Sequence, residues 1–148
     1  MFRGSSTHIL DDKGRFVIPA RFRDYVRASG GDVLMITRMD GTLFAYPLNE
    51  WNKIENRIMS LAEKSDSLRR FRRVFVGGAY ECSWDKQSRV LIPPALRQYA
   101  QLEKDIVLVG VQEHFEIWSQ PNWEKENETM EKDMQQVEVR NEIAKLGL

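Results

Sequence analysis

Short apolar runs separated by polar turns dominate the first 50 positions of the chain. The segment HILDDKGRFVIP holds two such runs around a glycine-containing turn, a pattern that predicts a β-hairpin. Pro19 cannot donate to a sheet but suits the first turn of a helix, so PARFRDY is predicted to be a short helix. The next two apolar runs, VLMIT and GTLFAYP, predict two more strands.

The same order of elements returns in the second half of the chain. PPALRQY repeats the short helix, and DIVLVG and HFEIW repeat the two strands that follow it. Gly77 and Gly78 mark the boundary between the halves. The pattern therefore predicts two repeats, residues 1–76 and 77–148, that share one hydrophobic core.

Helices are predicted after each set of strands, in LNEWNKIENRIMSLAEK, in SDSLRRFRRVF with a Ser65 or Asp66 cap, and as one amphipathic helix from residue 120 onward. Stripes of apolar residues at helical spacing usually form core or subunit contacts. The residues of these stripes are Trp51, Ile54, Ile58 and Leu61, then Leu68, Phe71 and Phe75 facing inward, then Trp123, Met130, Met134 and Val137.

A sequence repeat supports the repeat of elements. Windows 11–25 and 85–99 align without gaps and are identical at six of fifteen positions, where roughly one identity is expected by chance. The identical pairs are Asp11/Asp85, Arg15/Arg89, Ile18/Ile92, Pro19/Pro93, Arg23/Arg97 and Tyr25/Tyr99. Duplication within the chain is the better explanation.

Charge is balanced overall but not between the halves. Residues 1–75 carry 14 Lys/Arg against 9 Asp/Glu, and residues 76–148 carry 8 against 13. This asymmetry indicates either a basic and an acidic face or a charge-patterned surface without a partner. The lone Cys82 favours a reducing cytoplasm, and no apolar run reaches the roughly 18 residues of a membrane-spanning helix.

Few residues of the chain are suited to catalysis, so no catalytic residue, metal, cofactor or small-molecule substrate is predicted. Cys82 as a nucleophile would need His8 or His114 as its base, and three scattered Cys/His residues do not make a zinc site. Phosphate-binding glycine loops are absent from the sequence. An enzyme that uses His114 with Glu113 or Glu116 remains an alternative hypothesis.

The repeated unit Asp-x-x-x-Arg is the strongest candidate for a site. The aspartate can accept hydrogen bonds from the turn and from the arginine four residues on, which would fix the turn and aim the guanidinium outward. Each turn also contains a lysine, so each repeat offers two cations at an exposed tip. The residues are Asp11, Lys13 and Arg15 in the first turn and Asp85, Lys86 and Arg89 in the second. A salt bridge that merely closes the turn is the alternative.

DDKGRFVIP resembles the D-x-x-G-R-hydrophobic-x-I-P pattern of the AbrB-like swapped-hairpin DNA-binding domains. Two copies, with the opening MFRG and the segments YPLNEW, GGAYEC and LVGVQEHFEIW in order, are similar to the MraZ family over nearly the whole chain. The resemblance implies an α+β, mainly β fold, a double-split β-barrel built from both halves. It also implies a ring-like homo-oligomer that represses its own division and cell-wall operon by binding short promoter repeats in double-stranded DNA.

The resemblance places DNA contacts on Lys13, Arg15 and Arg89, and position adds Lys86 from the second turn and Arg3 beside the first hairpin. We rank Arg15 first, because Gln87-Ser88 replaces Lys13-Gly14 and is expected to change the second turn. Arginines are expected to read bases while the lysines and Arg3 neutralise phosphate. This assignment predicts that the protein is located in the cytoplasm and associated with the nucleoid.

Two alternatives to this assignment stay open. The run RRFRR, residues 69–73, is a second candidate DNA site, although a solvated helix face is favoured. A non-catalytic structural ring or adaptor that binds an acidic protein through the same turns is the other alternative. Sequence-specific DNA binding distinguishes the main hypothesis from the adaptor.

Overall fold

The computed structural model describes residues 1–61 and 65–148, and the two halves share one order of elements. The first half contains β1 (Ser5–Ile9), β2 (Arg15–Val17), α1 (Ala20–Ala28), β3 (Val33–Met39) and β4 (Thr42–Pro47). The second half contains β5 (Tyr80–Ser83), β6 (Arg89–Leu91), α4 (Pro94–Tyr99), β7 (Asp105–Val111) and β8 (His114–Ser119). The predicted order of strands and short helices is confirmed.

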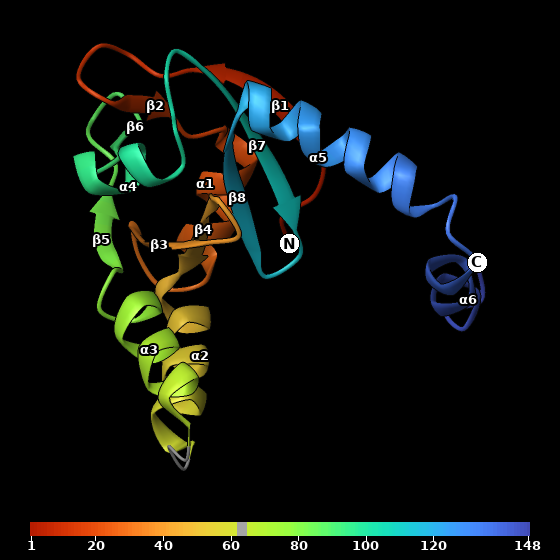
Figure 1. Cartoon of the computed structure of the whole chain (residues 1–148). Helices are drawn as coiled ribbons and strands as arrows, with labels where there is room; N and C mark the ends of the chain where they lie inside the picture. The colour runs from red at the N-terminus through yellow and green to blue at the C-terminus, as the bar shows by residue number, and fades with distance from the viewer. Residues whose placement is uncertain (62–64) are drawn as a thin grey trace.

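Two helices complete each half, and Figure 1 shows both pairs projecting from the body. They are α2 (Leu48–Ser60) and α3 (Asp66–Phe75), then α5 (Gln120–Asp133) and α6 (Val137–Ala144). The Ser65 side chain caps α3 by accepting from the backbone N–H of Leu68. The predicted first helix extended through residues 62–64, which lie outside the described residues. Within the described chain no helix is both long and apolar enough to cross a bilayer.

The prediction of one C-terminal helix is wrong. The backbone of Gln136 is extended, with φ −89° and ψ 132°, and it begins α6 as a separate helix. The sequence between α5 and α6 contains neither proline nor glycine, so it carries no signal of the interruption.

The strands of the two halves are interleaved in both sheets. The larger sheet has six strands in the order β1-β7-β8-β4-β3-β5, and β2 pairs with β6 in a separate two-stranded ribbon. Strands from opposite halves pair at β1–β7, β3–β5, β4–β8 and β2–β6, and every pairing is antiparallel. The mixed, mainly β class is confirmed, although the strands described form two sheets and not one closed barrel.

The prediction of a local hairpin across residues 8–19 is therefore wrong in its pairing. The turn itself forms, with the Asp11 N–H donating to the Arg15 carbonyl at 2.8 Å. Beyond that bond the two strands separate, and β1 pairs over five residues with β7 while β2 pairs with β6. Long-range ladders that bury apolar residues outweigh a short local ladder, as expected for exchanged hairpins.

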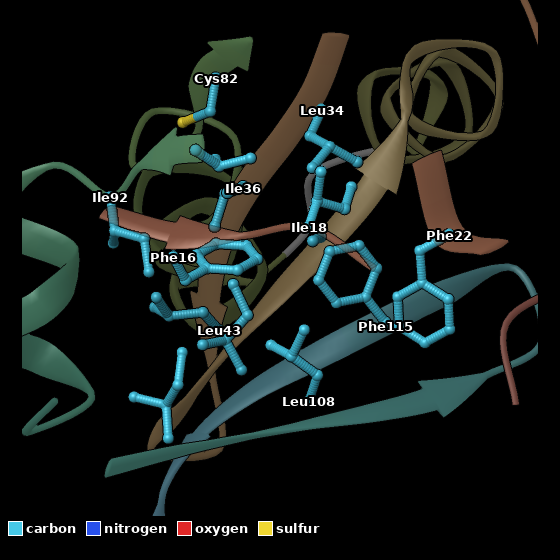
Figure 2. Packing of buried hydrophobic residues seen from close by; sticks show 14 of the residues in the cluster. Phe16, Ile18, Phe22, Leu34, Ile36, Leu43, Cys82, Ile92, Leu108 and Phe115 are labelled. Carbon is cyan, nitrogen blue, oxygen red and sulfur yellow. The ribbon is translucent and has the colours of Figure 1, made fainter. Parts of the chain in front are cut away.

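Equivalent residues of the two repeats meet in one core. Phe16, Ile18 and Phe22 from the first repeat and their counterparts Val90, Ile92 and Leu96 are each at most 1% exposed. Figure 2 shows side chains of both repeats gathered between the ribbon and the larger sheet. Full burial of each such side chain stabilises the fold by about 1.5–3 kcal/mol. Neither half can close this core with its own strands.

We predict that fragments 1–76 and 77–148, produced separately, do not fold. Each fragment lacks the partners of its cross-half strands and half of the core. Thermal unfolding followed by circular dichroism should show no cooperative transition for either fragment alone and a transition after co-expression. A cooperative transition in one isolated fragment would contradict the shared core.

Candidate nucleic-acid interface

A single carboxylate organises the turn that precedes β2. The Asp11 carboxylate accepts from the backbone N–H of Lys13 at 3.0 Å and from that of Arg15 at 2.8 Å. It also accepts from the Arg15 Nε at 2.8 Å. The Gly14 N–H donates to the Asp11 carbonyl at 2.9 Å, which closes the turn. Backbone and guanidinium are thus fixed by the same side chain.

The turn that precedes β6 has the same geometry. The Asp85 carboxylate accepts from the backbone N–H of Gln87 at 2.8 Å, from that of Arg89 at 3.0 Å and from the Arg89 Nε at 2.9 Å. The Ser88 N–H donates to the Asp85 carbonyl at 3.0 Å. The prediction of a different second turn is wrong.

Ser88 adopts the backbone conformation that glycine supplies in the first turn. Its φ is +60°, against +86° at Gly14. A non-glycine residue in the left-handed region costs about 1–2 kcal/mol. The Ser88 hydroxyl accepts a 2.5 Å hydrogen bond from Arg23 Nη1, which offsets part of that cost.

Arg23 and Arg97 are structural residues whose role was not predicted from the sequence. Arg23 of the first repeat binds Ser88 in the turn of the second. Arg97 of the second repeat lies against Gly14 in the turn of the first, so closely that a Cβ there would sit 2.1 Å from its Nη1. Each repeat therefore supports the other repeat's turn. The sequence signal for this role was that the same residue type, arginine, occupies positions 23 and 97 of the two aligned windows.

The ribbon places both arginines on one face. Arg15 is paired with Leu91 and Val17 with Arg89, while Phe16 and Val90 are buried on the opposite face. Because the strands are antiparallel, the arginines sit on a diagonal, with Cα atoms about 7–8 Å apart. The Ile18 N–H donates to Ser88 and the Ile92 N–H to Gly14, each at 2.9 Å. The ribbon thus has an approximate two-fold symmetry.

Arg15 and Arg89 are each held by an aspartate, but their side chains are not buried. The side chain of Arg15 is 25% exposed and that of Arg89 is 32% exposed. Each uses Nε for its aspartate, and within residues 1–61 and 65–148 the terminal nitrogens of both have no hydrogen-bond partner. Lys13 and Lys86 are exposed in the same turns. The guanidinium ends of two arginines and the side chains of two lysines are therefore available to a partner.

Arg3 does not lie beside these turns, contrary to expectation. Its neighbour Phe2 is buried and bridges to Gln112, near the connection between β7 and β8. The strand β1, five residues or about 16 Å long, separates Arg3 from the first turn. The ribbon face therefore excludes Arg3.

Arg69–Arg73 also lie away from the ribbon, on α3 (Figure 1). Arg69 forms an ion pair with Asp66. Of the three residues predicted to face inward, only Phe75 is buried, while Leu68 and Phe71 are 44% and 37% exposed. The tip of the α2–α3 pair projects past the sheet, so only its base has a surface to pack against.

The residues considered for catalysis are packed or buried in ways that indicate a structural role. His114 stacks on Phe44 with ring centroids 4.7 Å apart and contacts Glu116 Oε2 at 3.1 Å. Burial raises the pKa of the Cys82 thiol to about 12, which makes it a poor nucleophile at neutral pH. In the part of the chain that the structure describes, His, Cys, Asp and Glu form no cluster suited to a metal ion.

Comparison with known proteins finds similarity along the whole chain. A family model for the MraZ protein, described as antitoxin-like, matches residues 1–73 and 75–142. The chain is 55% identical over 148 residues to "Transcriptional regulator MraZ" of Desulforapulum autotrophicum, covering 100% of both chains. It is 54% identical over 148 residues to the protein of that name in Desulfosudis oleivorans, again with 100% coverage of both. The Syntrophobacter fumaroxidans protein of that name is 46% identical over 83% of this chain and 82% of its own.

The turns should make stability depend on acid pH. Backbone hydrogen bonds, from Arg15 to Asp11 and from Arg89 to Asp85, lower the pKa of both carboxyls below the usual 3.8. A folded-state pKa below the unfolded value stabilises the fold above that pH, and the contribution is lost as pH falls through the lowered pKa. We expect the double variant Asp11→Asn/Asp85→Asn to lose stability less steeply than the wild type below about pH 4.

Unfolding temperatures measured by circular dichroism from neutral pH to about pH 2.5 test this expectation. Asp12→Asn is the matched control, because Asp12 is exposed in the same turn and has no hydrogen bond among the described residues. The control should follow the wild-type curve. Equal slopes for the double variant and the wild type would show that the two carboxylates do not stabilise the fold.

Proposed function

The chain belongs to the MraZ family, and we propose that it is a sequence-specific DNA-binding transcriptional regulator that acts through the β2–β6 ribbon. The observation that carries the proposal is the pair of equivalent turns, each holding an arginine by Nε with its terminal nitrogens facing outward. The relatives carry the name of a regulator, a role without catalysis. We further propose that it represses its own division and cell-wall operon from short promoter repeats.

The ribbon suits the major groove of B-form DNA. The major groove admits a two-stranded β-ribbon, and an arginine fork there meets the O6 and N7 of guanine. On the same face Val17 and Leu91 are 54% and 51% exposed, which supports contact with thymine methyl groups. Lys13 and Lys86 stand in the turns at the two ends, where they would neutralise phosphates.

The charge of one ribbon is small, which favours several copies acting together. Its turns and arginines contain four cations and three carboxylates, which gives a net charge of +1. The residues are Lys13, Arg15, Lys86 and Arg89 against Asp11, Asp12 and Asp85. Such a site orients its donors well but attracts the duplex weakly. A ring-like homo-oligomer would align many ribbons with repeated DNA sites and raise the affinity through effective concentration. A cytoplasmic, nucleoid-associated location follows.

Alanine substitution of either arginine should lower sequence preference to a similar degree, because the two turns are equivalent. Loss of one bidentate contact removes about 1–3 kcal/mol of discrimination, or roughly 5- to 150-fold at each site. Arg15→Ala and Arg89→Ala should be compared by mobility shift on DNA upstream of this protein's own gene and on a shuffled sequence. Arg70→Glu, on α3 away from the ribbon, is the control and should keep the wild-type ratio.

The same assay separates the alternatives. A wild-type protein without any preference between the two DNAs would favour the structural ring or adaptor for an acidic protein. If both alanine variants still preferred promoter DNA over the shuffled sequence, the residues that recognise the sequence would lie outside the ribbon.

Lysine substitutions should change affinity without changing preference. Lys13→Ala and Lys86→Ala should weaken binding to promoter and shuffled DNA equally, and each lost phosphate contact should lower the slope of log affinity against log salt by about one. Titration at several salt concentrations by fluorescence anisotropy measures this slope. Arg3→Ala should leave it unchanged, since β1 separates Arg3 from the ribbon. A lysine variant with the wild-type slope would show that this lysine does not contact a phosphate.

A further inference from the structure

A polar cleft lies between the end of α4 and the beginning of α5. Because Ile106 of β7 pairs with Ser119 of β8, the start of β7 lies beside the residues that lead into α5. The rest of the lining comes from α4 and from the segment that joins it to β7, and Asn122 donates to Gln101 at 3.1 Å between these two parts. The cleft has a volume of about 790 Å³, and small-molecule sites typically span about 300–1,000 Å³. Its size therefore suits a small ligand.

Arg97 lines this cleft and has no acceptor for its guanidinium. Its counterpart Arg23 donates to the Ser88 hydroxyl, but the residue that Arg97 packs against is Gly14, which has no side chain to accept a bond. Among residues 1–61 and 65–148 the Arg97 side chain forms no hydrogen bond or ion pair, and its Nε is buried. A partly buried cation without a partner is unfavourable. An anion in the cleft would supply the missing acceptor.

The charges around the cleft favour a ligand with a single negative charge. Arg97 is partly buried, whereas the other charged residues of the lining are exposed: Lys104 and Lys125 against Glu103, Asp105 and Glu124. The three carboxylates disfavour a second negative charge, and a phosphate monoester carries about −1.5 to −2 at neutral pH. A carboxylate carries one negative charge and matches the planar fork of arginine. The anionic group that fits best is therefore a carboxylate.

Amide side chains provide further hydrogen bonds in the cleft. Four of them belong to the lining: Gln98, Gln101, Gln120 and Asn122. Each amide can both donate and accept, which suits the hydroxyl groups of a ligand. We propose that the cleft binds a small hydroxylated monocarboxylate whose carboxylate pairs with Arg97. Because Arg97 packs on Gly14, the bound ligand holds this side chain against the first turn.

Isothermal titration calorimetry on the full-length protein tests the site with three compounds that share a hydroxylated six-carbon skeleton: gluconate, glucose 6-phosphate and glucose. Gluconate should bind more tightly than glucose, which lacks a charge, and more tightly than glucose 6-phosphate, which has two. The absence of gluconate binding, or glucose binding of equal affinity, would overturn the site. Glucose 6-phosphate binding of equal or higher affinity would overturn the assignment of a monocarboxylate.

Two variants test the role of Arg97. Arg97→Gln should weaken gluconate binding on the order of tenfold or more, because a hydrogen-bonded charge pair is lost. Asn122→Asp adds a negative charge to the lining and should also weaken binding. Aspartate is favourable in the first turn of α5, so this variant keeps its fold even if Arg97→Gln does not. Circular dichroism verifies the fold of each variant.

Asn127→Asp is the matched control, because it adds the same charge to an exposed position of α5 outside the cleft. It should bind gluconate as the wild type does. Wild-type affinity in Asn122→Asp, or in a folded Arg97→Gln, would show that the ligand does not pair with Arg97. These titrations contain no DNA, so their result is independent of the proposed function.

Discussion

The hydrogen bonds of one aspartate in each repeat determine the shape of the candidate site. Asp11 and Asp85 each accept from two backbone N–H groups and one arginine Nε. The same carboxylate therefore sets the turn and the direction of the guanidinium, without burying either. The arrangement also cancels one positive charge per turn, so the site gains orientation while its electrostatic attraction for an anion decreases. A surface of this kind orients its donors well, and a high affinity for an anion would require several copies acting together.

The exchange of strands makes the two turns interdependent. The backbone of each ribbon strand donates to the turn of the other repeat, and Arg23 and Arg97 reach across in the same sense. The geometry of Arg15 thus depends on Ile92 and Arg97, more than 70 positions away in the chain. The site exists only when the shared core has formed, which links recognition to the folding of the entire body.

Local patterns predicted the elements well, and the pairing less well. Period-two runs and Pro19 or Pro93 located the strands and short helices correctly, because those features act over a few residues. The same runs could not reveal that β1 pairs with β7, since a swapped and a local hairpin share one pattern. At the site, the duplicated Asp-x-x-x-Arg unit located both turns, whereas Gln87-Ser88 suggested a difference that the positive φ of Ser88 removes. The exposure of Leu68 and Phe71 was missed because periodicity identifies an apolar face but not what covers it.

The pairing of β1 with β7 has a consequence for synthesis in the cell. Ser5 pairs with Val109, so the first strand has no sheet partner until about a hundred further residues have left the ribosome. At roughly 5–20 residues per second this wait lasts on the order of 5–20 s. During that time the nascent chain carries an unpaired strand and the apolar side chains of an unfinished core, the state in which aggregation and chaperone capture compete with folding.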